Sequence, residues 1–234
     1  MRSGLILLLF LLIPATLSAQ EQLVPVPRLA VTVFTGARAP FATGFVTAFG
    51  PEGQQLIQAY EERQGGTVLG LDAEVGTGGP LRLLVGGSYS QMGRGDFFTA
   101  EDARLGEGET FGVVYGGGTW FAKAGLSYRL QSQPSLTDAR RRAATDFFAA
   151  PALVRELSVT HPAFNYGFKG AFPVGTRGVE VMVGLEDYLV FWRKAELQEP
   201  IGNIFGQVAG AQSVEFLYDT SNRIVVRIGA TLRL

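Results

Sequence analysis

The chain has 234 residues, no cysteine and a formal net charge of −1 at pH 7. The lack of cysteine excludes a disulfide framework, and the near-neutral charge excludes a basic surface for nucleic acid. Hydrophobic residues make up 47% of the chain. After residue 19, however, no apolar run approaches the ~20 residues that a transmembrane helix needs.

The first 19 residues predict a secretory signal peptide. Arg2 is basic, residues 4–13 are apolar, and small residues follow. An apolar core of about ten residues is too short to cross a bilayer but suits a cleaved export signal. We therefore expect residues 1–19 to be removed in the mature protein, and residues 20–27 to be a periplasmic lead-in.

Alternation of apolar and polar side chains predicts an all-β structure over residues 28–234. The clearest example is residues 119–131, where apolar side chains alternate with Lys123, Ser127 and Arg129. Eight strands are expected, at residues 28–36, 67–76, 81–92, 110–116, 119–131, 158–172, 178–192 and 222–234. We interpret them as an eight-stranded antiparallel transmembrane β-barrel.

The predicted connections alternate between long and short. The long ones include a helix-like piece at residues 54–63 and a helical pattern within residues 132–157. Tight turns are expected at residues 77–80, 116–118 and 173–177, where glycine and proline concentrate. Long outer loops and short periplasmic turns are typical of outer-membrane barrels. Both chain ends would then lie in the periplasm.

Two other interpretations stay open. Residues 41–49 and 213–218 also alternate, and counting them would give ten strands. Ten strands would place both termini outside the cell, so we prefer eight, with these segments as hairpins or strand extensions above the membrane. A soluble β-sandwich or lipocalin-like barrel would also alternate. Small residues on the polar face, such as Gly86, Gly125 and Gly184, favour a crowded lumen instead.

The end of the chain carries the most specific motif. Arg227, Gly229, Leu232 and Leu234 fill the polar, glycine and two hydrophobic positions of the assembly signal that ends bacterial outer-membrane barrels. Many such barrels end in an aromatic residue, whereas this chain ends in leucine. The whole pattern resembles small outer-membrane barrels of the OmpA/OmpX type. This resemblance implies a monomer in the bacterial outer membrane, assembled by the barrel assembly machinery and surrounded by outer-membrane lipids.

The polar faces of the predicted strands carry many charges. An eight-stranded barrel is just wide enough to be filled by side chains, so charges inside it must pair. The predicted lumen charges are Asp72, Glu74, Arg82, Lys123, Arg129, Lys169, Glu180, Glu186, Arg227 and Arg233. Neighbouring strands suggest three pairs, which are Glu180 with Arg233, Glu186 with Arg227, and Glu74 with Arg82. Trp120 and Trp192 would mark the inner and outer aromatic girdles.

These features predict a structural or surface-interaction role exercised through long outer loops. A narrow solute channel and a lipid A-modifying enzyme are the alternatives. Outer-membrane lipid A deacylases, which the architecture also resembles, use a histidine with a serine two residues later. Here His161 is followed at that spacing by Ala163, so we expect no enzyme, no catalytic residue, no metal and no cofactor. Arg140-Arg141-Arg142, in a predicted outer loop, is a candidate site for lipopolysaccharide phosphates.

Overall fold

The structure, a computed structural model, describes most of the chain after residue 28. The described residues are 29–39, 41–63, 66–76, 79–91, 96–102, 110–115, 118–131, 143–156, 158–174 and 178–234. The predicted signal peptide (residues 1–19), the lead-in (residues 20–27) and residues 140–142 lie outside them.

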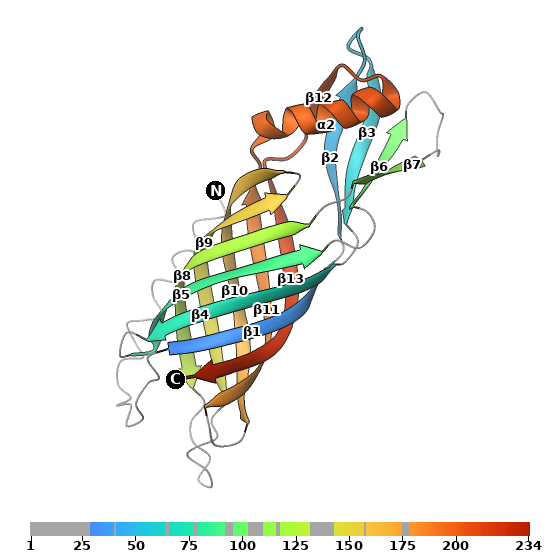
Figure 1. The fold of residues 1–234 in the computed structure, drawn as a ribbon. Helices are drawn as coiled ribbons and strands as arrows, with labels where there is room; N and C mark the ends of the chain where they lie inside the picture. Colours follow the sequence, from blue (N-terminus) through green and yellow to red (C-terminus); the bar gives the residue numbers. More distant parts are fainter. Residues whose placement is uncertain are drawn as a thin grey trace.

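Eight antiparallel strands form a closed barrel (Figure 1), in the order β1-β13-β11-β10-β9-β8-β5-β4. They are β1 (Leu29–Arg38), β4 (Thr67–Gly76), β5 (Leu81–Gln91), β8 (Thr119–Gln131), β9 (Ala144–Glu156), β10 (Val159–Val174), β11 (Val179–Phe191) and β13 (Thr220–Arg233). The barrel closes because β1 pairs with β13 on one side and with β4 on the other. The predicted eight-stranded fold is therefore confirmed.

The two ends of the barrel differ. The terminal end holds the start of β1 and the end of β13, where Leu234 donates its N–H to the Leu29 carbonyl at 2.9 Å. The opposite end, here the loop end, carries three long connections and one turn of two residues between β9 and β10. Ser158 in that turn has a φ of 65°.

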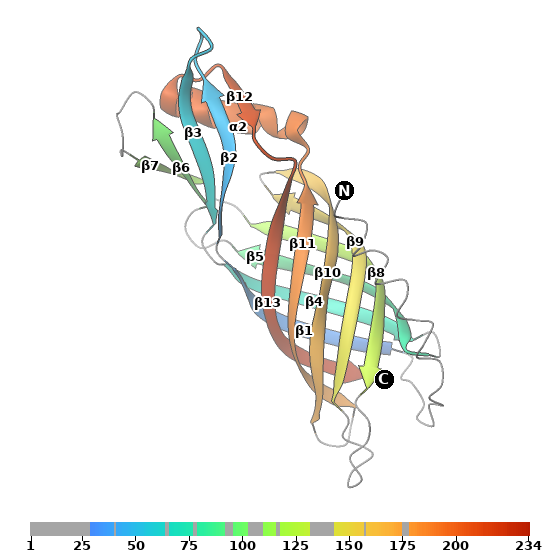
Figure 2. The same ribbon diagram turned by 180° about the vertical axis from the view of Figure 1, so that it is seen from behind.

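The three long connections build a second sheet beyond the loop end, which we call the cap. Its strand order is β12-β2-β3-β6-β7. The strands are β2 (Phe41–Phe49), β3 (Gln55–Arg63), β6 (Asp96–Asp102), β7 (Thr110–Tyr115) and β12 (Ser213–Phe216). A helix, α2 (Lys194–Ala209), crosses one face of this sheet, as the two opposite views in Figures 1 and 2 show.

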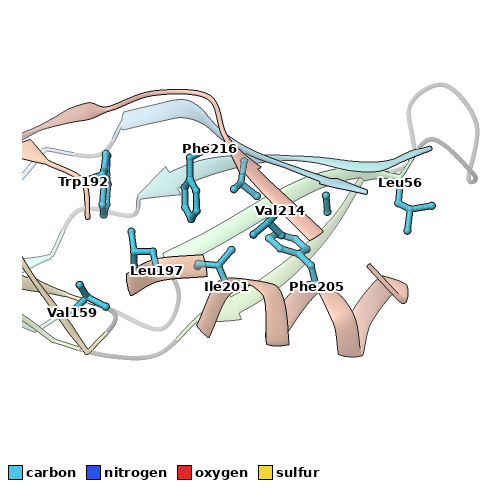
Figure 3. Packing of buried hydrophobic residues seen from close by; sticks show 10 residues of the cluster. Leu56, Val159, Trp192, Leu197, Ile201, Phe205, Val214 and Phe216 are labelled. Carbon is cyan, nitrogen blue, oxygen red and sulfur yellow. The ribbon is translucent and has the colours of Figure 1, made fainter. Parts of the chain in front are cut away.

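The cap has a hydrophobic core of its own (Figure 3). Leu197, Ile201 and Phe205 recur every four residues, so they share one face of α2, and all three are fully buried. They pack against the sheet through residues such as Val214. The same cluster includes Trp192, which follows β11 at the barrel mouth. The apolar face of α2 therefore fixes the cap to the barrel. Within the described residues, no helix is both long and apolar enough to cross a membrane.

The predicted number of barrel strands is correct, but one predicted strand is not in the barrel and one barrel strand was not predicted. Residues 110–116 were expected in the barrel, but β7 pairs with β6 in the cap. Residues 144–156, expected within a long outer loop with a helical pattern, form the barrel strand β9 between β8 and β10. Residues 54–63 are also not helical, because β3 pairs with β2 and β6. The segments at 41–49 and 213–218 do lie outside the barrel, as β2 and β12.

Residues 110–116 leave the barrel and β9 joins it. As a result, β8 runs from the loop end to the terminal end, opposite to the direction expected from the sequence. Gln131 and Ala144 pair with each other at the terminal end, whereas the sequence predicted an outer loop after residue 131.

Candidate functional site: charged lumen and cap

The outer surface of the barrel is apolar. Large hydrophobic side chains are exposed on all eight strands, including Val33 and Leu71 on neighbouring β1 and β4, and Val183 and Ile228 on neighbouring β11 and β13. Each alternates with a buried polar or small residue, as the period of a strand requires. A soluble protein rarely exposes such a continuous apolar band, whereas lipid-facing strands alternate in this way. On the strands that were predicted, the exposed apolar side chains therefore lie on the faces that the sequence predicted to be apolar.

The middle of the lumen is closed by a ring of four charges, the central quartet of Asp72, Lys123, Glu186 and Arg227. The Lys123 ammonium lies 2.6 Å from Glu186 and 3.3 Å from Asp72. The Arg227 guanidinium lies 2.7 Å from Asp72 and 3.3 Å from Glu186. Two positive and two negative groups therefore neutralise one another.

Aromatic rings complete this layer. The Arg227 guanidinium lies 4.9 Å from the ring centre of Phe34 and 4.8 Å from that of Phe148. Lys123 lies 5.0 Å from the same Phe148 ring. Such cation–π contacts stabilise desolvated cations. Together the quartet and the rings fill the cross-section, as expected for the narrow interior of an eight-stranded barrel.

A second group of charges, the terminal-end cluster, lies nearer the chain termini. Glu74 pairs with Arg82 at 3.2 Å and with Lys169. Glu180 pairs with Arg129 at 2.6 Å and with Arg233 at 2.7 Å. Asp146 lies within 3.9 Å of both Lys169 and Arg233, and 3.5 Å from Arg129. All seven side chains are buried inside the barrel.

The loop end holds a third arrangement beneath the cap. The Arg223 guanidinium lies 2.7 Å from Glu156 and 5.1 Å from the Trp192 ring centre. The His161 ring meets Trp192 edge-on, and its Nδ1 accepts the backbone N–H of Arg193 at 3.2 Å. These contacts connect the barrel mouth to the start of α2.

The structure places every predicted lumen charge inside the barrel, and all three suggested ion pairs are present. Sequence reasoning missed Asp146 and Glu156, because both lie on β9, which was taken for a loop. Asp146 and Phe148 are buried on one face of β9 and Phe147 is exposed on the other, so the strand period was the available signal. Among the described residues, no group of His, Asp or Glu side chains is arranged to hold a metal ion.

The two tryptophans do not mark opposite girdles. Trp120 is 59% exposed on the barrel exterior, with its ring centre 4.6 Å from that of Tyr89. It lies at the loop end, because β8 runs in the opposite direction from that expected. Trp192 is also at the loop end and is buried in the cap core. The predicted assignment of inner and outer girdles is therefore wrong.

The residues of the terminal motif occupy both faces of β13. Arg227 belongs to the central quartet, while Leu232 and Leu234 face outward. Gly229 lies where β13 meets β1, and a Cβ at this position would overlap the Val33 carbonyl oxygen. The motif therefore coincides with the seam that closes the barrel.

The cap carries a cleft of about 430 Å³ on the side of α2 that faces away from its core. Gly202 and Gly206 are among its lining residues, so the helix backbone is accessible there. The lining also includes the side chains Gln198, Glu199, Asn203, Gln207, Ala211 and Gln212. Four amides and one carboxylate give this cleft both donors and acceptors of hydrogen bonds.

No model of a protein family matches the chain, and no curated protein matches it either. Three solved outer-membrane proteins are similar over most of their length. Neisserial surface protein A is 8% identical, with 88% of this chain and 96% of that chain covered and a TM-score of 0.45. The outer membrane protease OmpT from Escherichia coli is 8% identical, covering 92% and 99%, with a TM-score of 0.38. A major outer membrane protein from Thermus thermophilus is 13% identical, covering 88% and 99%, with a TM-score of 0.33.

Because these TM-scores are below 0.5, the assignment of the architecture depends on the features of this structure alone. The closed pairing of eight antiparallel strands, the exposed apolar band and the charged lumen are together the architecture of an outer-membrane β-barrel protein.

Proposed function

We propose that this protein is a non-enzymatic surface-interaction barrel of the bacterial outer membrane, with the cap as its binding element. The apolar band would lie in outer-membrane lipid, the terminal end in the periplasm and the cap outside the cell. The observation that carries the proposal is the cap itself. Three separate connections converge on one five-stranded sheet with a packed helix and core, which is far more structure than closing a barrel requires.

The cleft on α2 supports an interaction role for the cap. It combines an accessible stretch of helix backbone with amide side chains, and it faces away from the core that fixes the cap. Polar partners such as exposed peptide segments or surface sugars would find both donors and acceptors there. The same chemistry makes lipid chains a poor fit for the cleft, because its lining has few apolar groups.

The lumen argues against the channel alternative. The central quartet is made of ion pairs between 2.6 and 3.3 Å whose side chains are at most 1% exposed. Phe34 and Phe148 cover the same layer. A solute would have to break several desolvated ion pairs in order to pass.

The position of His161 argues against a lipid A-modifying enzyme. The ring is fully buried and contacts Trp192 and the Arg193 backbone. It therefore faces the inside of the barrel mouth and not the surrounding lipid. Ala163, two residues later, supplies no nucleophile.

The test compares the complete protein with a variant lacking the cap, in which residues 41–63, 96–115 and 194–216 are replaced by short Gly/Ser turns. Both would be displayed on cells and assayed for binding to arrayed surface glycans and extracellular proteins. We expect binding by the complete protein only, while both proteins keep the heat-dependent gel mobility of a folded barrel. Equal binding by the two proteins would exclude the cap as the binding element. Stable conductance of the complete protein in planar bilayers would favour the channel.

A further inference from the structure

The terminal-end cluster is not electrically balanced. It holds four bases, Arg82, Arg129, Lys169 and Arg233, against three acids, Glu74, Asp146 and Glu180. None of the seven side chains is more than 9% exposed. Among the described residues, one positive charge of this desolvated cluster is therefore left without a counter-charge, which is costly in a narrow lumen.

The hydrogen bonds of the cluster show the same imbalance. Among the seven described side chains of this cluster, four buried guanidinium donors have no hydrogen-bond partner, namely Nε of Arg82, Nε of Arg129, and both Nε and Nη1 of Arg233. On the acceptor side of these described side chains, only the Oδ1 atom of Asp146 is unpaired, and the Ser127 hydroxyl can serve as either. Unpaired donors thus exceed unpaired acceptors, in the same direction as the excess of positive charge.

The central quartet provides an internal comparison. Its donors without a hydrogen-bond partner are Nε and Nη2 of Arg227. Its acceptors without one are Oε1 of Glu186 and Oδ1 of Asp72, the latter in an ion pair with Lys123 at 3.3 Å. Two donors, two acceptors and zero net charge can be satisfied by water, which both donates and accepts. Water cannot satisfy the terminal-end cluster in the same way, because each water molecule adds two hydrogen-bond donors and the cluster has few unpaired acceptors.

We propose that the terminal end of the lumen binds one small monovalent anion, of the size of a halide, between Arg82, Arg129 and Arg233. Such an anion accepts several N–H groups, donates none, and brings the cluster to neutrality. Its size is limited because side chains fill an eight-stranded barrel. Arg233, the most exposed member at 9%, pairs with Ala30 at the terminal end of the barrel, so the anion would exchange from that end. This inference is independent of any role of the cap.

The first test locates the anion. Crystals of the full-length protein grown with sodium bromide should show one bromide by anomalous scattering, within hydrogen-bond distance of Arg82, Arg129 and Arg233. Water alone at this position would overturn the proposal.

The second test measures the effect in solution on the folded protein in detergent. Its unfolding temperature should rise with the logarithm of chloride concentration, because only the folded barrel forms the site. Sodium methanesulfonate at equal ionic strength supplies a larger monovalent anion and should produce no such rise. Equal responses to both salts would indicate general screening and overturn the proposal. A bromide peak without a chloride response would mean binding at crystal concentration only, which also overturns it.

Matched variants assign the effect to the cluster. Arg82→Gln removes the excess charge and one unpaired donor, while Glu74 keeps its contact with Lys169. We expect this variant to fold and to lose the chloride dependence. Arg155→Gln removes one charge from an exposed position near the loop end and should keep the full dependence. Should Arg82→Gln fail to fold, the bromide peak and the comparison of the two salts still decide the question.

Discussion

The barrel and the cap are built with opposite polarity. In the barrel, charged side chains such as Asp72 and Arg227 are buried inside, and hydrophobic side chains such as Leu71 and Val183 are exposed outside. In the cap, Leu197 and Phe205 form a buried core, while amides line the outer side of α2. The two regions belong to one chain and share the same strand alternation.

The difference shows that each region is shaped by its surroundings. A strand with one apolar and one polar face can bury either face, and the surrounding medium decides which. The barrel faces an apolar exterior, so its polar faces turn inward and must pair their charges. The cap faces water, so its hydrophobic faces turn inward and pack. The same substitution should therefore have opposite or very unequal effects in the two regions.

The largest expected difference concerns glycine at the barrel seam. In Gly229→Asp the new side chain would overlap the Val33 carbonyl oxygen and carry a charge into the seam between β13 and β1. We expect no folded barrel in the outer-membrane fraction, shown by loss of the unboiled gel band. Gly202→Asp adds the same group on α2, where a Cβ meets open space, and should fold. Normal levels of Gly229→Asp would show that the seam tolerates a side chain and that the terminal motif is not needed.

The next contrast concerns ion pairs. Glu186→Gln removes one acid from the central quartet and leaves Lys123 and Arg227 with Asp72 alone. Breaking a buried pair costs ~3–5 kcal/mol, because the remaining charge stays desolvated. Glu196→Gln in the cap breaks an exposed pair with Arg193 at 2.6 Å, and exposed pairs contribute only ~0.2–1 kcal/mol. Denaturant unfolding in detergent measures both. Equal costs would mean that water reaches the quartet.

The third contrast concerns arginine substitutions of exposed hydrophobic residues in the barrel and near the cap. Val183 on β11 is 48% exposed, and Leu217, which directly follows the cap strand β12, is 42% exposed. Arginine at Val183 should destabilise the barrel by ~2–4 kcal/mol if the position lies in mid-bilayer. Arginine at Leu217 should change stability by less than ~0.5 kcal/mol, because an exposed residue next to the cap faces water. The measurement is unfolding of each variant in lipid vesicles. A neutral Val183→Arg would show that the apolar band does not meet lipid.

The sequence identified the barrel because lipid and lumen impose strict alternation on most of its strands. It failed at β9 because alanines there occupy both faces and hide the period. Ala149 and Ala150, for example, lie on opposite sides of the strand. Proline at residue 151 also suggested a broken helix. The pairing with β8 and β10 decided the structure of this segment over its local preference.

The cap was not predictable for a different reason. Alternation indicates a strand but does not say to which sheet the strand belongs, so residues 110–116 were placed in the barrel. The segment that became β3 has a helical pattern, and its structure is decided by pairing with β2 and β6. The ion pairs between Glu180 and Arg233 and between Glu186 and Arg227 were predictable, because they depend only on which neighbouring strands face the same lumen.

The smallest expected effect is that of replacing glycine by alanine, and it should stabilise the cap but destabilise the barrel. Gly202 lies inside α2, and a Cβ there would meet no atom within 4 Å. Gly202→Ala should therefore stabilise the cap by ~0.5–1 kcal/mol, because glycine costs about that much in a helix interior. Gly125→Ala on β8 should destabilise the barrel, because its Cβ would overlap the Ala149 carbonyl oxygen. Hydrogen exchange of α2 amides measures the first change, and thermal unfolding of the barrel measures the second. If Gly202→Ala instead weakens protection of α2, Gly202 must contact another group in the folded protein, and the cleft is not open.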